Sequence, residues 1–173
     1  MLPAGNSMSH WWPVKSYVGG LEHRKWAHVR ALIQRVNRAS VSVDREIVGA
    51  IGTGLCVFVG VTHDDDDDKA TKMATKIWNL RIFEDEEKRM NKSLGDVDGE
   101  VLVVSQFTLY GDTNKGRRPS FVEAASPEIA EPLIAYLCEL LEDMGANVAT
   151  GRFRCHMEVE IYNDGPVTLT IDV

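Results

Sequence analysis

Hydrophobic positions recur along the chain at the spacing of strands in several places. Residues 31–36 and 40–44 are predicted to form two short strands, and in the second one valines alternate with polar residues as in half-buried strands. Residues 55–59 and 101–104 are wholly apolar, which predicts strands covered on both faces. The glycines of segment 52–54 predict a turn before the first of these apolar strands.

The pattern changes to helical spacing in two places. Apolar residues over 70–78 recur at this spacing behind a run of aspartates, which are favourable at a helix N-terminus. A second helix is expected to begin at Pro127, with Ser126 as its N-cap, and to end at Gly145. Pro132 is expected to bend this helix or to delay its start. Its buried stripe is predicted to consist of Ile129, Leu133, Leu137, Leu140, Leu141 and Met144.

Two alternating strands at 157–162 and 167–172 are predicted to close the chain, joined by a tight turn at 163–166. The order of elements predicts an α+β domain with two mostly antiparallel sheet layers and with helices packed on one side. This domain is expected to span residues 29–173. Residues 1–28 lack periodicity, and we expect a loosely ordered N-terminal extension, cloning-derived residues or an upstream start, with an organelle transit peptide as the alternative.

Composition and charge narrow the classes of function. The chain has 173 residues, which fits one domain, and no apolar run approaches the ~18–20 residues of a membrane span. Its 19 basic and 26 acidic residues give a net charge of −7, so the average surface repels a phosphate backbone and any anion site must be local. The three cysteines show no metal-ligand spacing and favour neither a disulfide framework nor a zinc site. Nucleotide-loop, serine-hydrolase and zinc-hydrolase motifs are absent, and we interpret His63 as solvated and His156 as structural.

Three segments combine residue types that suit a ligand site. The first is the end of an apolar strand, where sheet proteins hold ligands, and it consists of Ser105, Gln106, Phe107 and Thr108. The second is a compact basic patch that suits a phosphate or an RNA 3′ end, formed by Lys115, Arg117 and Arg118. The third is the pair Gly165 and Pro166, whose turn can point backbone carbonyls at a ligand. The respective alternatives are a strand that passes from core to surface, a solvated loop and an ordinary hairpin turn.

These segments give the chain a specific resemblance to the D-aminoacyl-tRNA deacylase family, also called the D-tyrosyl-tRNA deacylase family. The resemblance rests on four short stretches in the expected order, namely 30–36, 79–83, 105–110 with 115–121, and 163–168. It covers roughly residues 29–173 and implies the three-layer ββα sandwich of that family.

The resemblance implies a cytoplasmic, homodimeric proofreading enzyme that uses no metal or cofactor and does not bind membranes. Such an enzyme hydrolyses the ester that joins a D-amino acid, or glycine mischarged on tRNA(Ala), to the 3′-terminal adenosine of tRNA. In this family the Gly-Pro pair is cis and reaches into the pocket of the neighbouring subunit. The resemblance implies that the carbonyl oxygens of Gly165 and Pro166 exclude the side chain of an L-amino acid. The enzyme then selects by rejecting L-amino acids and does not recognise which side chain the D-amino acid carries.

The resemblance also assigns roles to individual residues. Arg35 would brace the Gly-Pro turn, and the backbone amides of Phe107 and Thr108 would stabilise an oxyanion. Thr108 is a weak candidate for a nucleophile because the sequence places no base beside it, and the alternative is that the 2′-hydroxyl of the tRNA orients the attacking water. Further support for the Gly-Pro motif is assigned to Asn163, Val167 and Thr168. Binding of the tRNA 3′ end is assigned to Lys115, Arg117, Arg118 and Phe121, the last by stacking on adenine.

A nucleic-acid-binding module of the same fold, without hydrolysis, is the main alternative, because one eukaryotic branch of this family is associated with DNA near replication origins. A long basic tail after the last strand would mark that branch. The printed sequence stops at Val173 and is acidic overall, which favours the enzyme. A purely structural subunit would give no reason for the Gly165-Pro166 turn or for the basic patch.

Overall fold

The computed structural model describes residues 28–114 and 116–173. Apart from its last residue, the expected N-terminal extension lies outside these residues. The elements in chain order are β1 (Arg30–Val43), β2 (Glu46–Ile51), β3 (Gly54–Gly60), α1 (Asp67–Asn79), β4 (Phe83–Glu84), β5 (Met90–Lys92), the 3-10 helix η1 (Gly95–Val97), β6 (Glu100–Ser105), the 3-10 helix η2 (Phe107–Tyr110), α2 (Pro127–Asp143), β7 (Asn147–Thr150) and β8 (Glu158–Asp172).

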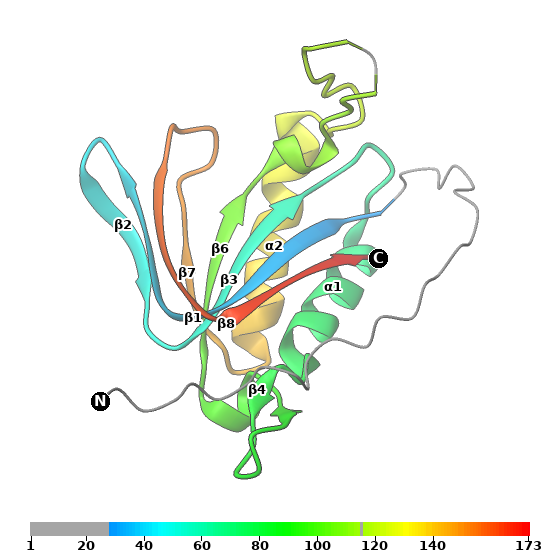
Figure 1. The fold of residues 1–173 in the computed structure, drawn as a ribbon. Helices are drawn as coiled ribbons and strands as arrows, with labels where there is room; N and C mark the ends of the chain where they lie inside the picture. The colour runs from blue at the N-terminus through cyan, green and yellow to red at the C-terminus, as the bar shows by residue number, and fades with distance from the viewer. Residues whose placement is uncertain (1–27, 115) are drawn as a thin grey trace.

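The predicted α+β class is confirmed, but the predicted pair of mostly antiparallel layers is only partly right. The main sheet has the order β2-β1-β3-β6-β7, and β8 pairs with β1. Strand β1 is antiparallel to β2, β3 and β8, whereas β3, β6 and β7 run parallel to one another. The sheet curls until β2 and β7 come into contact, so that one mixed sheet is nearly closed into a barrel (Figure 1).

Strand β1 explains this curl. Its first half pairs with β3 and its second half with β2, while β8 pairs along nearly its whole length. The prediction of two strands over 31–36 and 40–44 is therefore wrong, since the exposed pair Asn37 and Arg38 interrupts the apolar pattern but not the strand. The sequence reading also missed β2, which follows a tight turn at Asp44 and Arg45, where φ is 52° and 68°.

Both predicted helices are present. The side chain of Asp66 caps α1 by accepting a hydrogen bond from the backbone N–H of Lys69 at 2.9 Å. Helix α2 begins at Pro127, so the expected delay at Pro132 is wrong. Gly145 follows the helix with φ of 104°, the left-handed conformation of a C-terminal cap.

The buried stripe of α2 was largely predicted. Leu133, Leu137 and Leu141 are buried, and Leu140 and Met144 pack against the core as partly buried residues. The prediction for Ile129 is wrong, because this residue lies in the first turn of the helix and is 39% exposed. Cys138 belongs to the buried stripe instead.

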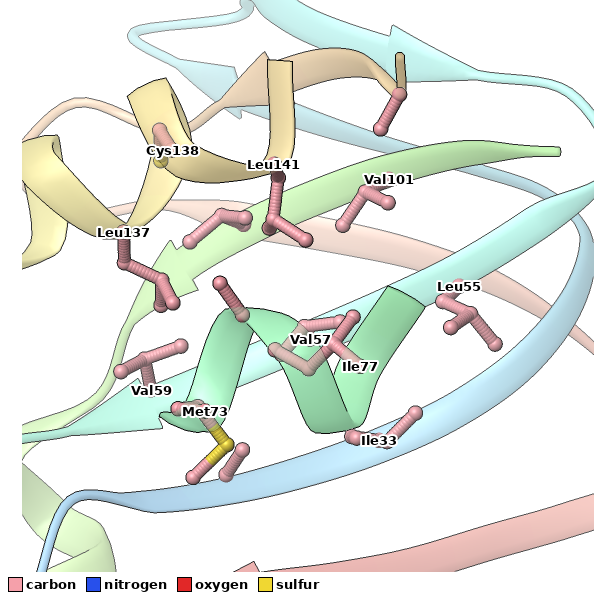
Figure 2. Close-up of a cluster of buried hydrophobic side chains, with 14 of the residues drawn as sticks. Ile33, Leu55, Val57, Val59, Met73, Ile77, Val101, Leu137, Cys138 and Leu141 are labelled. Carbon is pink, nitrogen blue, oxygen red and sulfur yellow. The ribbon is translucent and has the colours of Figure 1, made fainter. Parts of the chain in front are cut away.

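The core has two parts, one on each face of the sheet. In Figure 2 the side chains of Met73 and Ile77 from α1 and of Leu137 from α2 lie against the strands. Strand β3 directs Leu55, Val57 and Val59 to this helical side. Its Cys56 belongs to a second cluster inside the curl of the sheet. The prediction that 55–59 is covered on both faces is therefore confirmed.

Candidate functional site: a strand-end pocket and a braced bulge

The carboxyl ends of three parallel strands meet at one edge of the sheet. Because Val59 pairs with Ser105 and Val103 pairs with Thr150, the chain leaves β3, β6 and β7 at neighbouring points. Ligand sites form preferentially at such carboxyl edges. A cavity of about 610 Å³ lies there, within the range of roughly 300–1,000 Å³ that holds small ligands. We call this cavity the pocket.

Six parts of the chain line the pocket. They are the ends of β3 and β6 with the residues that follow them, the loop before α2, the first turns of α2, the connection 151–157 between β7 and β8, and the start of β8. Three of the four residues predicted from the strand end are among them: Ser105, Gln106 and Phe107. Thr108 is exposed and is not among the residues that line the pocket.

Aromatic side chains dominate the mouth of the pocket. Phe107, 58% exposed, meets Phe121 edge to face with ring centroids 5.0 Å apart. Phe153 contributes a third ring from the 151–157 connection. A mostly apolar cleft with three rings is suited to a flat heterocycle.

The 3-10 helix η2 follows β6 and begins beside the pocket, which Phe107 lines and Thr108 does not. Phe107 and Thr108 are its first two residues, and the first N–H groups of a helical turn have no partner within it. The turn itself is fixed, since Gln106 N donates to Val59 O at 2.8 Å and Gly111 N donates to Thr108 O at 3.0 Å. Gln106 Nε2 donates a hydrogen bond to Thr108 Oγ1.

The loop that carries Phe121 is tied to the chain after β3. Thr62 Oγ1 donates to Glu123 O at 2.5 Å, and His63 Nε2 lies 2.7 Å from Val122 O. Asp65 holds Thr62 in turn by accepting its N–H at 2.7 Å, and burial raises the pKa of this carboxyl group. His63 is thus exposed, as expected, but it also contacts the pocket loop.

The predicted turn at 163–166 is wrong, because the chain does not reverse there. Gln34 pairs with Thr168 and Val36 pairs with Asn163, so Arg35 alone faces the four residues 164–167 of β8. Both halves of β8 therefore run in one direction along β1. We call residues 164–167 the bulge, because extra residues on one strand of an antiparallel pair define a β-bulge.

Arg35 holds the bulge from within the protein. It is only 4% exposed, and its Nε lies 2.9 Å from the Asp164 carboxylate and donates to the Asp164 carbonyl at 3.3 Å. Its Nη1 donates to Ile82 O at 2.5 Å. A planar, permanently charged guanidinium can satisfy several acceptors in this way.

The tip of the bulge is exposed and conformationally restricted. Gly165 has φ of 128°, and a Cβ atom there would lie 2.7 Å from Val167 Cγ2. The Gly165–Pro166 peptide bond is cis, and both residues are exposed. Asn163 closes the base of the bulge, since its Oδ1 accepts the Val167 N–H at 3.0 Å. Its Nδ2 lies 3.4 Å from Thr168 Oγ1.

The predicted site residues thus fall into separate groups. The bulge and its supports do not line the pocket of their own chain. Arg117 and Arg118 are exposed on the loop that leads to Phe121, and Lys115 lies outside the described residues. Within residues 28–114 and 116–173, no group of three or more His, Cys, Asp or Glu residues could hold a metal ion. No helix in that part of the chain is long and apolar enough to cross a membrane.

The wall formed by the 151–157 connection was not predicted from the sequence. Arg154, Cys155, His156 and Met157 all line the pocket, and His156, interpreted from the sequence as structural, is exposed there. No local motif marks this segment. The parallel pairing of β6 with β7 brings it beside Ser105, and this pairing could not be predicted because β7 itself was missed.

The fold and site define an α+β protein with a mostly apolar cleft of about 610 Å³ at a strand edge. Residues 32–172 match the family model described as D-Tyr-tRNA(Tyr) deacylase. A D-aminoacyl-tRNA deacylase from Symbiobacterium thermophilum is 55% identical over 144 residues, covering 83% of this chain and 95% of the relative. One from Heliobacterium modesticaldum is 57% identical over 144 residues and covers 83% and 96%. A solved structure described as c-Myc DNA Unwinding Element Binding Protein has a TM-score of 0.79 and 41% identity, covering 83% of this chain and 98% of its own.

The chain therefore belongs to the D-Tyr-tRNA(Tyr) deacylase family. The resemblance found from four short segments of sequence is confirmed.

Proposed function

We propose that the protein is a D-aminoacyl-tRNA deacylase, an enzyme that hydrolyses the ester between a D-amino acid and the 3′-terminal adenosine of tRNA. The family match over residues 32–172 carries this proposal. The pocket supports it, because its volume and its aromatic mouth suit an adenosine. Adenine stacks on Phe121, as aromatic side chains receive unpaired RNA bases.

The reaction needs a water molecule and a polarised ester. The water oxygen adds to the ester carbonyl carbon, and the carbonyl oxygen becomes an oxyanion. The intermediate then collapses to the free amino acid and the ribose hydroxyl, which takes up a proton. The backbone amides of Phe107 and Thr108 stabilise the oxyanion, and removal of one such donor typically costs about 2.7–4 kcal/mol of transition-state stabilisation.

Thr108 does not serve as the nucleophile in this proposal. The contact of its hydroxyl oxygen is with the amide nitrogen of Gln106, a group that donates a hydrogen bond and cannot take up a proton. A threonine hydroxyl without a base is a weak nucleophile. The 2′-hydroxyl of the substrate orients the water instead, and the protein contributes position and electrostatics.

Chiral selection follows if the bulge of one subunit enters the pocket of a second. Gly165 and Pro166 are exposed, are held by Arg35 and do not line their own pocket, which supports donation across a homodimer. Their carbonyl oxygens then reject the side chain of an L-amino acid. A D-amino acid, or glycine mischarged on tRNA(Ala), escapes this rejection.

The remaining parts of the proposal concern the setting of the enzyme. We assign residues 29–173 to the deacylase domain and residues 1–28 to an extension, with the family match at 32–172 as support. The enzyme acts in the cytoplasm, where it recycles tRNA and keeps D-amino acids out of translation.

The direct test follows the release of amino acid from D-tyrosyl-tRNA, L-tyrosyl-tRNA and glycyl-tRNA. The expected result is rapid release from the D and glycyl esters and none above background from the L ester. Equal release from the D and L forms, or no release from any, would end the proposal.

The chiral filter has its own test in Pro166→Ala. This variant is expected to gain activity on L-tyrosyl-tRNA by a larger factor than it loses activity on the D ester, because the wedge that excludes the L side chain loosens. Pro132→Ala, at an exposed position of α2, is the matched control and should leave both rates unchanged. If L esters stay untouched by Pro166→Ala, selection does not work by this steric route.

One observation favours a second candidate function, DNA binding without hydrolysis. It is the 41% identity to the structure described as c-Myc DNA Unwinding Element Binding Protein. Fluorescence anisotropy with single-stranded and duplex DNA separates the two candidates. Tight DNA binding by a protein that releases no amino acid from any of the three esters would replace the deacylase proposal.

A further inference from the structure

We propose that Arg152 and Arg154, on the connection between β7 and β8, bind the phosphodiester backbone of the single-stranded RNA that leads into the pocket. This inference rests on the proposed function, in which a terminal adenosine occupies the pocket. It adds a second cationic contact, on a part of the chain different from the one predicted at Lys115, Arg117 and Arg118.

The placement of the two arginines carries the argument. Arg154 lines the pocket and is exposed, and Arg152 lies two residues before it, also exposed. The connection is fixed at its base, because Gly151 N donates to Val103 O at 3.1 Å and Cys155 N donates to Arg152 O at 3.2 Å. The backbone of Arg154 is therefore fixed at the pocket, with that of Arg152 two residues before it in the same connection.

These charges are available to a ligand. Residues 151–157 contain two arginines and no carboxylate, in a chain whose net charge is −7. Neither arginine forms an ion pair with any part of the chain that the structure describes. A hydrogen bond with Ser126 lowers the pKa of Glu128, in the first turn of α2, and the charge of Arg154 lowers it further, but Glu128 and Arg154 do not reach ion-pair distance.

The backbone conformation of Arg154 supports the same inference. Its φ is 59°, a left-handed conformation that a glycine adopts freely and an arginine adopts only with strain. Strained residues of this kind cluster at binding and active sites. Here the strained residue is an arginine that lines the pocket.

The proposed substrate contains the group that the two arginines would bind, a phosphate. When the pocket holds the terminal adenosine by its base, the 5′-phosphate of this nucleotide must lie toward the mouth of the pocket, where the strand continues to the preceding nucleotide. Arginine binds phosphate through paired N–H donors and full charge. In an acidic protein, such a local contact is needed to hold the strand.

The test compares two substrates that share the ester and differ in phosphate. They are D-tyrosyl-tRNA and 3′-O-D-tyrosyl-adenosine, the second of which has no phosphate. For Arg154→Gln we expect a rise in KM for the tRNA ester of about 3–10-fold with unchanged kcat, and a slope of log KM against log salt concentration that falls by ~0.7 for one lost contact. The adenosine ester should show unchanged KM and kcat.

Three further variants separate charge from structure. Arg154→Lys should restore most of the affinity, and Arg154→Gly should behave like Arg154→Gln although it relieves the strained backbone. Arg45→Gln is the matched control, since Arg45 is exposed with a left-handed φ of 68° in the β1–β2 turn and does not line the pocket. It should leave KM and the salt slope unchanged.

The outcomes distinguish the inference from the proposed function. Equal losses on both esters, or an unchanged salt slope, would overturn the phosphate contact while hydrolysis by the wild type still stands. If the wild type hydrolyses neither ester, the proposed function fails. In that case, fluorescence anisotropy with deacylated tRNA tests the phosphate contact independently of hydrolysis. Weaker, less salt-dependent binding by Arg154→Gln than by the wild type supports the contact, and identical binding overturns it.

Discussion

The pocket and the bulge are built in different ways, although the proposed site needs both. Six parts of the chain form the pocket, and many separate hydrogen bonds between loops hold them together. The bulge is four residues of one strand, held mainly by two side chains, the buried Arg35 and Asn163. A structure supported at many points should tolerate single changes, while one supported by two side chains should not. Substitutions in the two regions can test this difference.

The largest effect is expected for Gly165→Ala. The added Cβ atom meets Val167, and the φ of 128° disfavours any L side chain, at a cost of about 1–3 kcal/mol. The bulge must therefore rearrange, and we expect turnover of D-tyrosyl-tRNA to fall more than about tenfold, the equivalent of 1.4 kcal/mol in the barrier. Single-turnover kinetics measure this fall.

Gly145→Ala is the control for that experiment. Gly145 also has a positive φ, of 104°, but a Cβ atom there would lie 3.8 Å from the side chain of Trp78, an ordinary van der Waals contact. The two variants share the backbone penalty and differ in the steric contact. An equal loss of activity in both would show that the packing of the bulge is unimportant.

The next effect in size is on stability, in Arg35→Met. The substitution keeps much of the apolar stem but leaves the Ile82 and Asp164 carbonyls without their donor, which costs about 2–3 kcal/mol in the free energy of unfolding. Urea denaturation measures the change. Arg38→Met is the comparison, because Arg38 is exposed on the same strand and stacks on Tyr162, a contact worth only about 0.5–1 kcal/mol. Similar losses in the two variants would contradict a special role for Arg35.

The two regions also differ in how far the sequence predicts them. The residues of the bulge were singled out from the sequence, but its shape was not. A tight turn and a bulge have the same local signature of Asn, Asp, Gly and Pro between alternating strands. The choice between them depends on whether β1 pairs with both halves of β8, and β1 lies more than a hundred residues away.

The sequence predicted only the part of the pocket where the end of an apolar strand coincides with the motif at 105–108. Apolar strands β3 and β6 and both helices follow from periodicity, which places Ser105 at a strand end. The 151–157 wall depends on the parallel pairing of the four-residue strand β7, whose burial pattern carries no alternation. Short strands and their partners are set by tertiary packing, so local pattern cannot reveal them.

The smallest expected effect concerns the three thiols. Cys56 and Cys138 are buried in the core, whereas Cys155 lines the pocket. Burial raises the pKa of Cys56 to about 12 and that of Cys138 to about 11, the latter with help from Glu142 and Glu139. At pH 8 their thiolate fractions are thus on the order of 10⁻⁴ and 10⁻³, and thiolate is the reactive form. The unfolded chain loses these protons first as pH rises above about 9, so the free energy of unfolding should fall with pH in that range.

Cys155 lines the pocket and is only half-buried, so it should be the first thiol to react with iodoacetamide at pH 8 in the native protein. Added adenosine should slow this alkylation several-fold, because a nucleoside in the pocket covers the sulfur. Mass spectrometry of tryptic peptides locates the label, and Cys56 serves as the internal control that labels only after unfolding. Protection of Cys155 by adenosine but not by ribose would identify the pocket as a nucleobase site independently of any hydrolysis. Without such protection, the aromatic mouth does not receive the base, and the pocket would have to bind another part of the substrate while the bulge keeps its separate role.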